Sequence, residues 1–140
     1  TNLLEGQKVP LMGQGENIRE WLYVEDHVSA IDLCLQKGKI GETYLVQGEE
    51  KTNLEVTKKL LQILGMDESM IENVPHRLGH DFRYATSGAK VMALGWQRKH
   101  NFDEGLAETV RWYKENEWWW ESLKKDRPNL GREAQKKYEH

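Results

Sequence analysis

The sequence predicts a small mixed α/β domain, and three observations indicate this fold class. Short segments rich in aromatic and β-branched residues alternate with longer stretches in which apolar residues recur at helical spacing. Capping-box patterns at Thr52–Glu55 and Asn101–Glu104 mark two helix starts. Glycines at 38, 65 and 95 follow helical stretches, which they are suited to end. With 140 residues, the chain forms one domain or part of one.

The first half of the chain is predicted to contain strands and one helix. Residues 8–12 form a short edge strand that includes Pro10, and residues 13–15 then turn the chain. Residues 18–24 are extended, a helix runs from Asp26 to Gly38, and residues 42–46 form a further strand. The apolar stripe of this helix comprises Val28, Ile31 and Leu35, with Ala30 and Cys34 beside them.

The second half is predicted to be mainly helical. Its elements are a helix capped by Thr52, a strand over 70–74, a loop over 75–84, a short helix over 87–94, and a long helix from Phe102 to about Lys124. We therefore expect one domain over residues 1–124 and a polar, poorly ordered tail over residues 125–140.

Composition limits the class of partner. Hydrophobic residues make up 38% of the chain and charged residues 31%, an apolar content that a missing partner domain would explain. A net charge of −3 argues against nucleic acid or an anionic membrane as a partner. The single cysteine, Cys34, cannot form an internal disulfide. Without a signal-peptide pattern or a membrane-spanning apolar run, a cytoplasmic protein is expected.

A glycine pair at residues 13 and 15 comes close to a dinucleotide-binding fingerprint. Ile18 stands where the third glycine would be, and the following residues are predicted to be extended. The fingerprint needs a helix N-terminus to hold the pyrophosphate. A turn is therefore the better interpretation.

Arg19 and Arg77 are candidates for binding an anion. A guanidinium presents a planar fork of donors that matches two phosphate oxygens, although Arg19 could equally form a surface ion pair with Glu16 or Glu20. His76 and His80 are four residues apart, but they lack a third ligand for a metal ion.

Two further features leave alternatives open. Asn53, at the first turn of its helix, could serve as a cap or could bind a ligand through its amide. Trp118, Trp119 and Trp120 are consecutive, so on a helix they cannot all face one core. At least one of them is exposed or meets something outside the chain.

Several motifs occur in an order that resembles a known family. They are Gly13-Gln14-Gly15, Ile18–His27, Gly41-Glu42-Thr43-Tyr44, Lys51–Val56, Arg77–Ala85, Leu94-Gly95-Trp96, Phe102–Leu106, Thr109-Val110 and Trp112-Tyr113. From about Gly6 to Trp120 the chain resembles the C-terminal, substrate-binding part of nucleotide-sugar dehydratases, above all dTDP-glucose 4,6-dehydratases, in the extended short-chain dehydrogenase/reductase family.

This resemblance implies a substrate site. Arg19 and Arg77 would bind the diphosphate, Asn53 and His80 would contact the nucleotide portion, and the strand with Pro10 and Met12 would lie beside the base. Three departures bear on specificity: the family commonly has tyrosine at Met12, and its loop usually has proline at Leu78 and arginine at Phe82. They leave base preference open, and they fit either a divergent member or a relaxed pseudo-enzyme.

The resemblance also implies a partner domain. In the family, an N-terminal Rossmann domain holds NAD and a catalytic Tyr-x-x-x-Lys pair, whereas no tyrosine of this chain has lysine four residues later. We therefore expect no catalytic, cofactor-binding or metal-binding residue here, and an inactive isolated chain. A full-length enzyme would convert dTDP-glucose to its 4-keto-6-deoxy product with NAD.

Other readings of the chain stay open. One is part of a UDP-sugar epimerase or decarboxylase, and another is a non-catalytic nucleotide-sugar-binding or interaction module. The start at Thr1 fits either truncation or removal of an initiator methionine.

Overall fold

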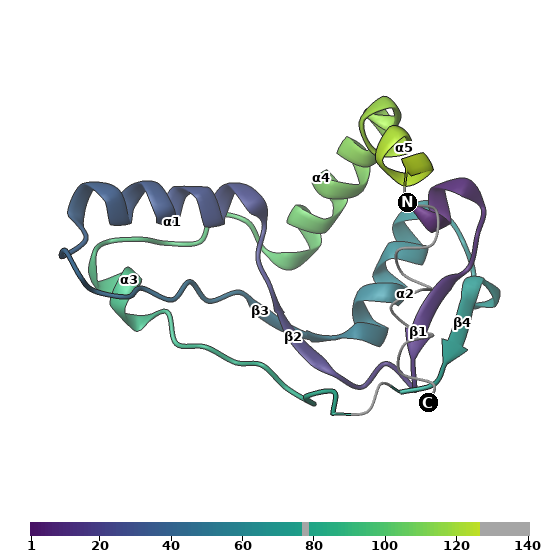
Figure 1. Ribbon diagram of the computed structural model, residues 1–140, viewed down its shortest axis with the longest axis horizontal. Helices are drawn as coiled ribbons and strands as arrows, with labels where there is room; N and C mark the ends of the chain where they lie inside the picture. The colour runs from purple at the N-terminus through teal and green to yellow at the C-terminus, as the bar shows by residue number, and fades with distance from the viewer. Residues whose placement is uncertain (77–78, 127–140) are drawn as a thin grey trace.

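The computed structural model describes residues 1–76 and 79–126 and shows a mixed α/β fold, as the sequence predicts (Figure 1). The strands are β1 (Val9–Met12), β2 (Ile18–Trp21), β3 (Glu49–Thr52) and β4 (Ile71–Val74). The helices are α1 (Val24–Lys37), α2 (Asn53–Leu64), α3 (Ala89–Ala93), α4 (Phe102–Glu115) and α5 (Glu117–Asp126), with 3₁₀ helices at Asn2–Glu5 and Glu68–Met70. No helix in these ranges is long and apolar enough to cross a membrane. Of the tail predicted over residues 125–140, Lys125 and Asp126 belong to α5, and the rest lies outside the described residues.

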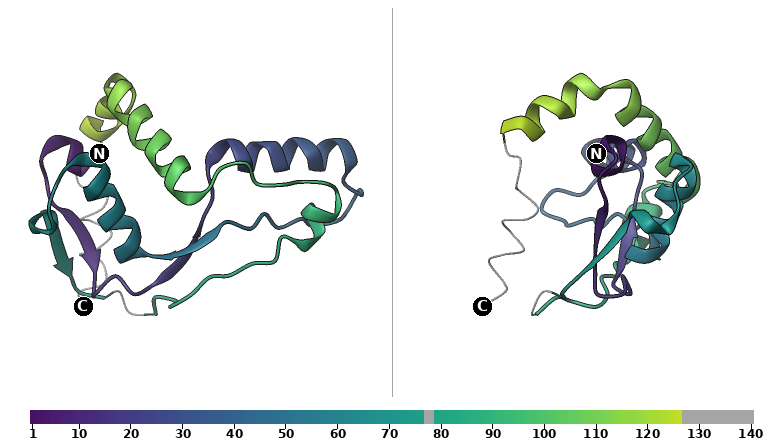
Figure 2. Two further views of the ribbon diagram at one scale, coloured as in Figure 1. Left: turned by 180° about the vertical axis from the view of Figure 1, so that it is seen from behind. Right: turned by 90° about the vertical axis from the view of Figure 1, so that its right-hand side faces the viewer.

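The elements form two lobes, which β2 and β3 connect (Figures 1 and 2). One lobe contains α1, α3 and the extended residues 42–48, and the other contains β1, β4, α2, α4 and α5. Strand β1 pairs parallel with β4, and β2 pairs antiparallel with β3, so that Ile18 lies opposite Thr52. The N-terminus is held in the second lobe, where the ammonium group of Lys124 on α5 donates to the side chain of Asn2 at 2.9 Å.

The core of the first lobe is centred on Ala30, Val91 and Trp96, all of which are buried. The Trp96 indole N–H lies 3.2 Å from the Asp26 carbonyl oxygen and 3.0 Å from the Ser29 hydroxyl. Burial of the large indole is therefore compatible with its polar N–H group, because that group finds acceptors at the start of α1.

A buried carboxylate fixes the same region. The side chain of Asp26 is 1% exposed and accepts hydrogen bonds at 3.0 Å from the backbone N–H groups of both Lys99 and His100. Burial alone would raise the pKa of Asp26, but these two bonds and the His100 ring outweigh it, so the pKa lies below its ordinary value of 3.8. Asp26 thus attaches the segment leading into α4 to the first turn of α1.

The start of α2 confirms the predicted capping box. The Thr52 hydroxyl accepts from the Glu55 N–H, and the Glu55 carboxylate accepts from the Thr52 N–H. The first N–H groups of a helix have no partner within it, and here two of them are used by the preceding turn. Asn53 donates to the Asn17 carbonyl at 3.0 Å and Leu54 donates to the Gly15 carbonyl at 2.9 Å. The helix start is therefore held against residues 15–17.

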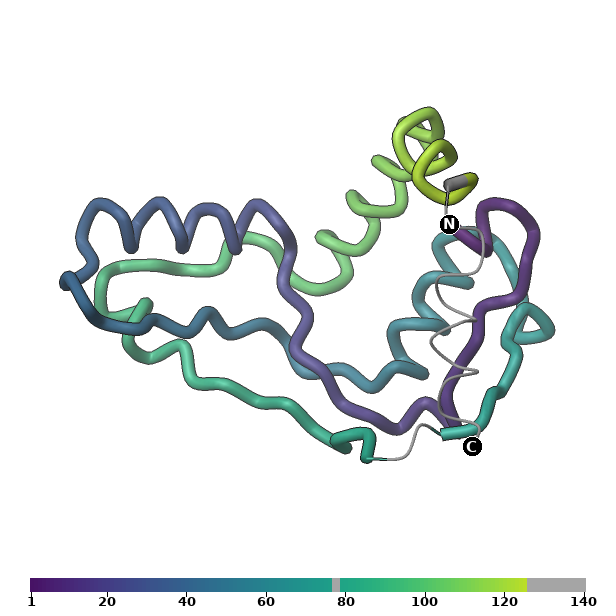
Figure 3. The backbone as a smooth tube through the Cα atoms, viewed as in Figure 1, coloured from purple at the N-terminus to yellow at the C-terminus, as the bar shows by residue number. Residues whose placement is uncertain are grey.

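The strand predicted over residues 42–46 is wrong. These residues are extended and run beside α1, but among the described residues no neighbouring strand bonds to their backbone (Figure 3). The strand forms instead at Glu49–Thr52, where β2 supplies a partner despite a charged sequence of low β-propensity. The availability of a neighbouring strand overrode local propensity.

The prediction of one apolar stripe on α1 is also wrong. Ala30 faces the core, and Cys34 packs against it, whereas Val28, Ile31 and Leu35 are 57%, 48% and 81% exposed. At 100° per residue, the two sets are centred roughly 110° apart around the helix. Helix α1 therefore has a second apolar face, which the described residues do not cover. Below, the term outer stripe means Val24, Val28, Ile31 and Leu35.

The long helix predicted to reach Lys124 is interrupted at Asn116. This residue leaves helical geometry, and its side-chain amide donates to the Trp112 carbonyl at 2.9 Å. The break turns α5 back, which buries Trp120 and leaves Trp118 70% exposed. The prediction that the three tryptophans cannot share one core is confirmed.

We expect Asp26→Asn to lower the free energy of unfolding by about 1–3 kcal/mol at neutral pH, because the hydrogen bonds to a buried charge are weakened. The folded-state pKa lies below the unfolded value of 3.8, so the stabilisation is present above that pH and is lost as pH falls through the folded-state pKa. The variant should lack this part of the acid dependence in urea unfolding. Asp32→Asn, at an exposed site on the same helix, is the control. Equal losses of unfolding free energy in both variants would contradict this stabilising role of Asp26.

Candidate functional site

Arg19 lies on β2 and is surrounded by acceptors. One terminal nitrogen, Nη1, donates to the carbonyl oxygens of Ile18 at 2.6 Å and Phe82 at 3.3 Å. The other, Nη2, donates to the Asp81 carbonyl at 2.9 Å and lies 2.9 Å from Nε2 of His80. The guanidinium carbon also lies 4.4 Å from the centre of the Tyr84 ring. Arg19 therefore holds the loop over residues 79–84 through both terminal nitrogens.

Backbone pairing places this loop beside β2. The Ile18 N–H donates to the Phe82 carbonyl at 2.8 Å, and the Tyr84 N–H donates to the Ile18 carbonyl at 3.3 Å. Arg83 then forms a 2.5 Å ion pair with Glu50 on β3. Strand β2 is consequently bonded along one edge to β3 and along the other to the loop.

The structure brings two of the predicted site residues, Arg19 and His80, into direct contact. Asn53 is linked to the same strand through its N–H, which donates to the carbonyl of Asn17, two residues before Arg19. Thr52, the cap before Asn53, is paired with Ile18 next to Arg19. Below, the term arginine junction means Arg19 with the surrounding Asn17, Asn53 and loop 79–84.

The other three predicted site residues are Pro10, Met12 and Arg77. Pro10 and Met12 lie on β1, opposite Glu72 and Val74 of β4. Among the described residues, no hydrogen bond or ion pair joins either of them to Arg19, although the Met12 carbonyl accepts from Gly15 in the turn that leads to the junction. Arg77 lies outside the described residues, so its role stays a prediction.

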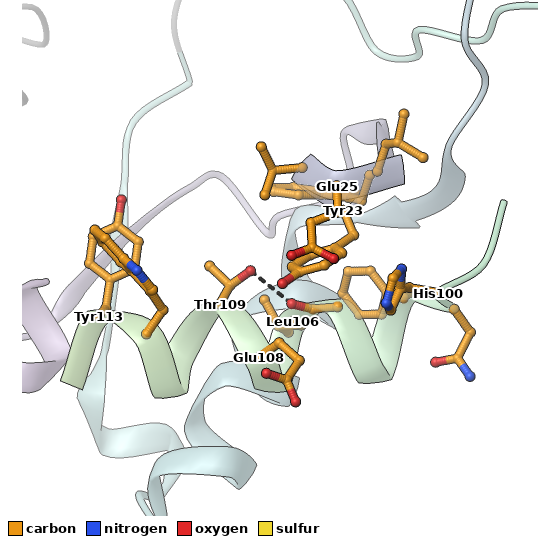
Figure 4. Close-up of a pocket in the computed structure, with 14 residues that line it drawn as sticks. Tyr23, Glu25, His100, Leu106, Glu108, Thr109 and Tyr113 are labelled. Atoms are coloured by element: carbon orange, nitrogen blue, oxygen red, sulfur yellow. Dashed lines mark hydrogen bonds between the residues drawn. The ribbon is translucent and has the colours of Figure 1, made fainter. Parts of the chain in front are cut away.

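A pocket of about 620 Å³ lies between the start of α1 and one side of α4 (Figure 4). Tyr23 lies against His100, with ring centres 4.7 Å apart. Gly105 on α4 allows Tyr23 to lie close to that helix, because a Cβ atom at residue 105 would lie only 2.8 Å from Cβ of Tyr23. Burial raises the pKa of Tyr23, and the nearby carboxylates of Glu25 and Glu108 raise it further.

None of the predicted site residues lines this pocket. Its fourteen lining residues include two carboxylates and no lysine or arginine, which makes it unsuited to a diphosphate. Sequence analysis missed the pocket because Phe102, Leu106 and Tyr113 fit the apolar face of a core helix equally well. The arginine junction is therefore the better candidate for binding an anionic ligand.

The described residues contain no grouping suited to a metal ion, and the turn at residues 13–15 does not form a dinucleotide fingerprint. In residues 1–76 and 79–126, no three His, Cys, Asp or Glu side chains are grouped so that they could hold a metal. The turn at residues 13–15 leads into strand β2 and not into a helix, so it lacks the helix N-terminus that a pyrophosphate needs. The residues near this turn do not fit NAD.

Two solved structures with the same fold are enzymes whose names refer to sugar nucleotides. The DesIV dTDP-glucose 4,6-dehydratase of Streptomyces venezuelae, solved with NAD and TYD, is 48% identical with a TM-score of 0.83, over 87% of this chain and 38% of that one. UDP-glucose 4-epimerase of Thermotoga maritima, solved with UDP-glucose, is 31% identical with a TM-score of 0.75, over 81% and 37%.

The fold and the arginine junction thus define part of an extended short-chain dehydrogenase/reductase. Residues 1–109 match the family model described as GDP-mannose 4,6 dehydratase, and the chain belongs to this family. The dTDP-glucose 4,6-dehydratase of Streptomyces niveus is 46% identical over 126 residues, which cover 89% of this chain. This chain spans about 38% of the length of that relative.

We expect Arg19→Ala to speed amide hydrogen exchange in residues 79–86 by about tenfold or more, because the loop loses its bonds to the guanidinium. Mass spectrometry of the exchanged peptides would measure this change. Arg111→Ala is the matched control, since Arg111 is exposed and pairs only locally with Glu108. Unchanged exchange in the loop of Arg19→Ala would show that Arg19 does not hold it.

Proposed function

We propose that this chain is the substrate-binding portion of a dTDP-glucose 4,6-dehydratase and that the arginine junction binds the nucleotide diphosphate. The observation that carries the proposal is the contact of Arg19 with His80, beside the strand to which Asn53 is bonded through Asn17. These three residues are among those that the family resemblance assigns to the substrate. The high identity to dehydratases supports this enzyme over the epimerase, whose identity to the chain is lower.

Phosphate binding at Arg19 works by exchange of acceptors. The terminal nitrogens already donate to three carbonyl oxygens and face His80. Phosphate oxygens carry formal charge and form stronger, charge-assisted bonds than neutral carbonyls. A diphosphate therefore displaces some of these contacts, while His80 and Asn53 remain close enough to approach the nucleotide. This fixes the substrate for a reaction that takes place elsewhere in the enzyme.

The chemistry belongs to another portion of the protein. In the full-length enzyme, NAD would take a hydride from C4 of the sugar, water would be eliminated across C5 and C6, and the hydride would return to C6 to give the 4-keto-6-deoxy product. This chain has no Tyr-x-x-x-Lys pair and no residues suited to NAD, so we expect the isolated chain to bind substrate without converting it. In this scheme the chain contributes binding and orientation.

The NAD-holding portion would pack on the outer stripe of α1. The stripe residues are 48–81% exposed, although Ala30 on another side of the helix is fully buried. Beside α1, the backbone of residues 43–47 is extended and bonds to no strand among the described residues. A helix that is apolar on two sides belongs between two layers, and an unpaired extended segment can join the edge of a sheet. The relatives are long enough to supply that layer, since this chain matches about 38% of their length.

We expect the chain to bind dTDP and Arg19→Ala to bind it about 10- to 100-fold more weakly, as loss of charge-assisted bonds worth about 1.5–3 kcal/mol requires. Isothermal titration calorimetry would measure both affinities. Arg19→Lys, which keeps the charge but loses the planar fork, should fall between them. Arg111→Ala should match the wild type. Equal affinity in Arg19→Ala would refute the assignment, and preference for UDP over dTDP would favour an epimerase.

A chimaera would test the whole proposal. We expect the Streptomyces venezuelae dehydratase, with its matching region replaced by this chain, to convert dTDP-glucose. Val28→Glu/Ile31→Glu in the chimaera should reduce activity and lower the melting temperature, because it places charge in the contact between the two portions. Asp32→Asn/Gln36→Glu, on an exposed polar side of α1, is the control. A chimaera that binds NAD and dTDP but leaves dTDP-glucose unchanged would argue for a non-catalytic module.

A further inference from the structure

Asn17 occupies a central place in the arginine junction. It is 3% exposed and lies in the short connection between the turn at residues 13–15 and strand β2. Its side-chain Nδ2 donates to the Asp81 carbonyl at 3.1 Å, and its own carbonyl accepts from the Asn53 N–H at 3.0 Å. One residue thus connects two segments that carry ligand-binding candidates.

The position of Asn17 relates these segments to Arg19. Asp81 is next to His80, and its carbonyl accepts from both Asn17 and Arg19, so the two residues hold the same point of the loop. On the other side, the bond to Asn53 sets where α2 begins relative to β2. Asn17 therefore fixes the spacing between His80 and Asn53 on either side of Arg19.

The chemistry of the asparagine side chain suits this role better than it suits stability alone. The asparagine amide supplies a neutral donor to the Asp81 carbonyl, whereas aspartate would place a charged acceptor against it. The remaining oxygen of the Asn17 amide is buried without a hydrogen bond from the described residues, and an unpaired buried acceptor is destabilising. The residue keeps a donor aimed at the loop in spite of that cost.

We propose that Asn17 is a positioning residue of the nucleotide-diphosphate site, whose side chain acts through the loop at His80, while its backbone carbonyl holds the start of α2 whatever the side chain. This inference rests on the proposed function. Asn17 itself lies beneath the site, and it contributes to affinity by holding groups that contact the ligand.

A double-mutant cycle on dTDP affinity tests this indirect role. We expect Asn17→Ala and His80→Ala each to weaken binding about tenfold, and the double variant to bind about as weakly as one single variant, because both remove the same His80 contact. A merely structural role would instead lower the urea midpoint without coupling to His80. Effects that multiply to about a hundredfold in the double variant would overturn the inference.

Asn116→Ala is the matched control. Its Nδ2 also donates to a backbone carbonyl, that of Trp112, at 2.9 Å, but it lies between α4 and α5, outside the arginine junction. We expect its dTDP affinity to equal that of the wild type. If Asn17→Ala does not fold, Asn17→Leu replaces it in the cycle, since it keeps the approximate size of the side chain and removes the donor without adding a charge.

The two proposals fail in different ways. A wild-type chain that does not bind dTDP would refute the proposed function, and the inference about Asn17 with it. Binding by the wild type that depends on Arg19, combined with wild-type affinity in both Asn17 variants, would refute the inference and leave the proposed function standing.

Discussion

Hydrogen bonding along both edges of strand β2 determines the arrangement of the candidate site. Ile18 is paired with Thr52 on one side and bonded to Phe82 and Tyr84 on the other. Because a strand fixes its neighbours at a constant spacing, the loop and the start of α2 are each positioned relative to Arg19. The functional candidates come from distant parts of the sequence, yet a single short strand sets the distances between them.

Much of the helical structure could be predicted because its signals are local. The capping boxes at Thr52 and Asn101 formed as expected, and Gly38 and Gly65 end their helices. Strand β3 could not be predicted, because Glu49–Thr52 has little β-propensity and pairs only since β2 lies beside it. The break at Asn116 was also missed, although the hydrogen bond from its side-chain amide to the Trp112 carbonyl is local.

The site shows a similar division between local and tertiary signals. Arg19, His80 and Asn53 were found through a family resemblance, and the structure brings Arg19 and His80 into contact. Asn17 and Asp26 escaped notice, because a polar residue in sequence gives no sign that tertiary contacts will bury it. Both are held by backbone groups remote in sequence, Asn17 by Asp81 and Asp26 by Lys99 and His100. Such partners become visible only when the fold is known.

The full engagement of Arg19 has a consequence for selectivity. In the proposed function, its terminal nitrogens would lose protein acceptors when a ligand binds, so the net gain in binding free energy would be a difference between two sets of hydrogen bonds. A neutral hydroxyl offers nothing better than the carbonyls it would displace, whereas a doubly charged diphosphate does. A ligand must therefore form stronger hydrogen bonds to Arg19 than the protein carbonyls do, and free sugars in the same solution would compete poorly for the arginine.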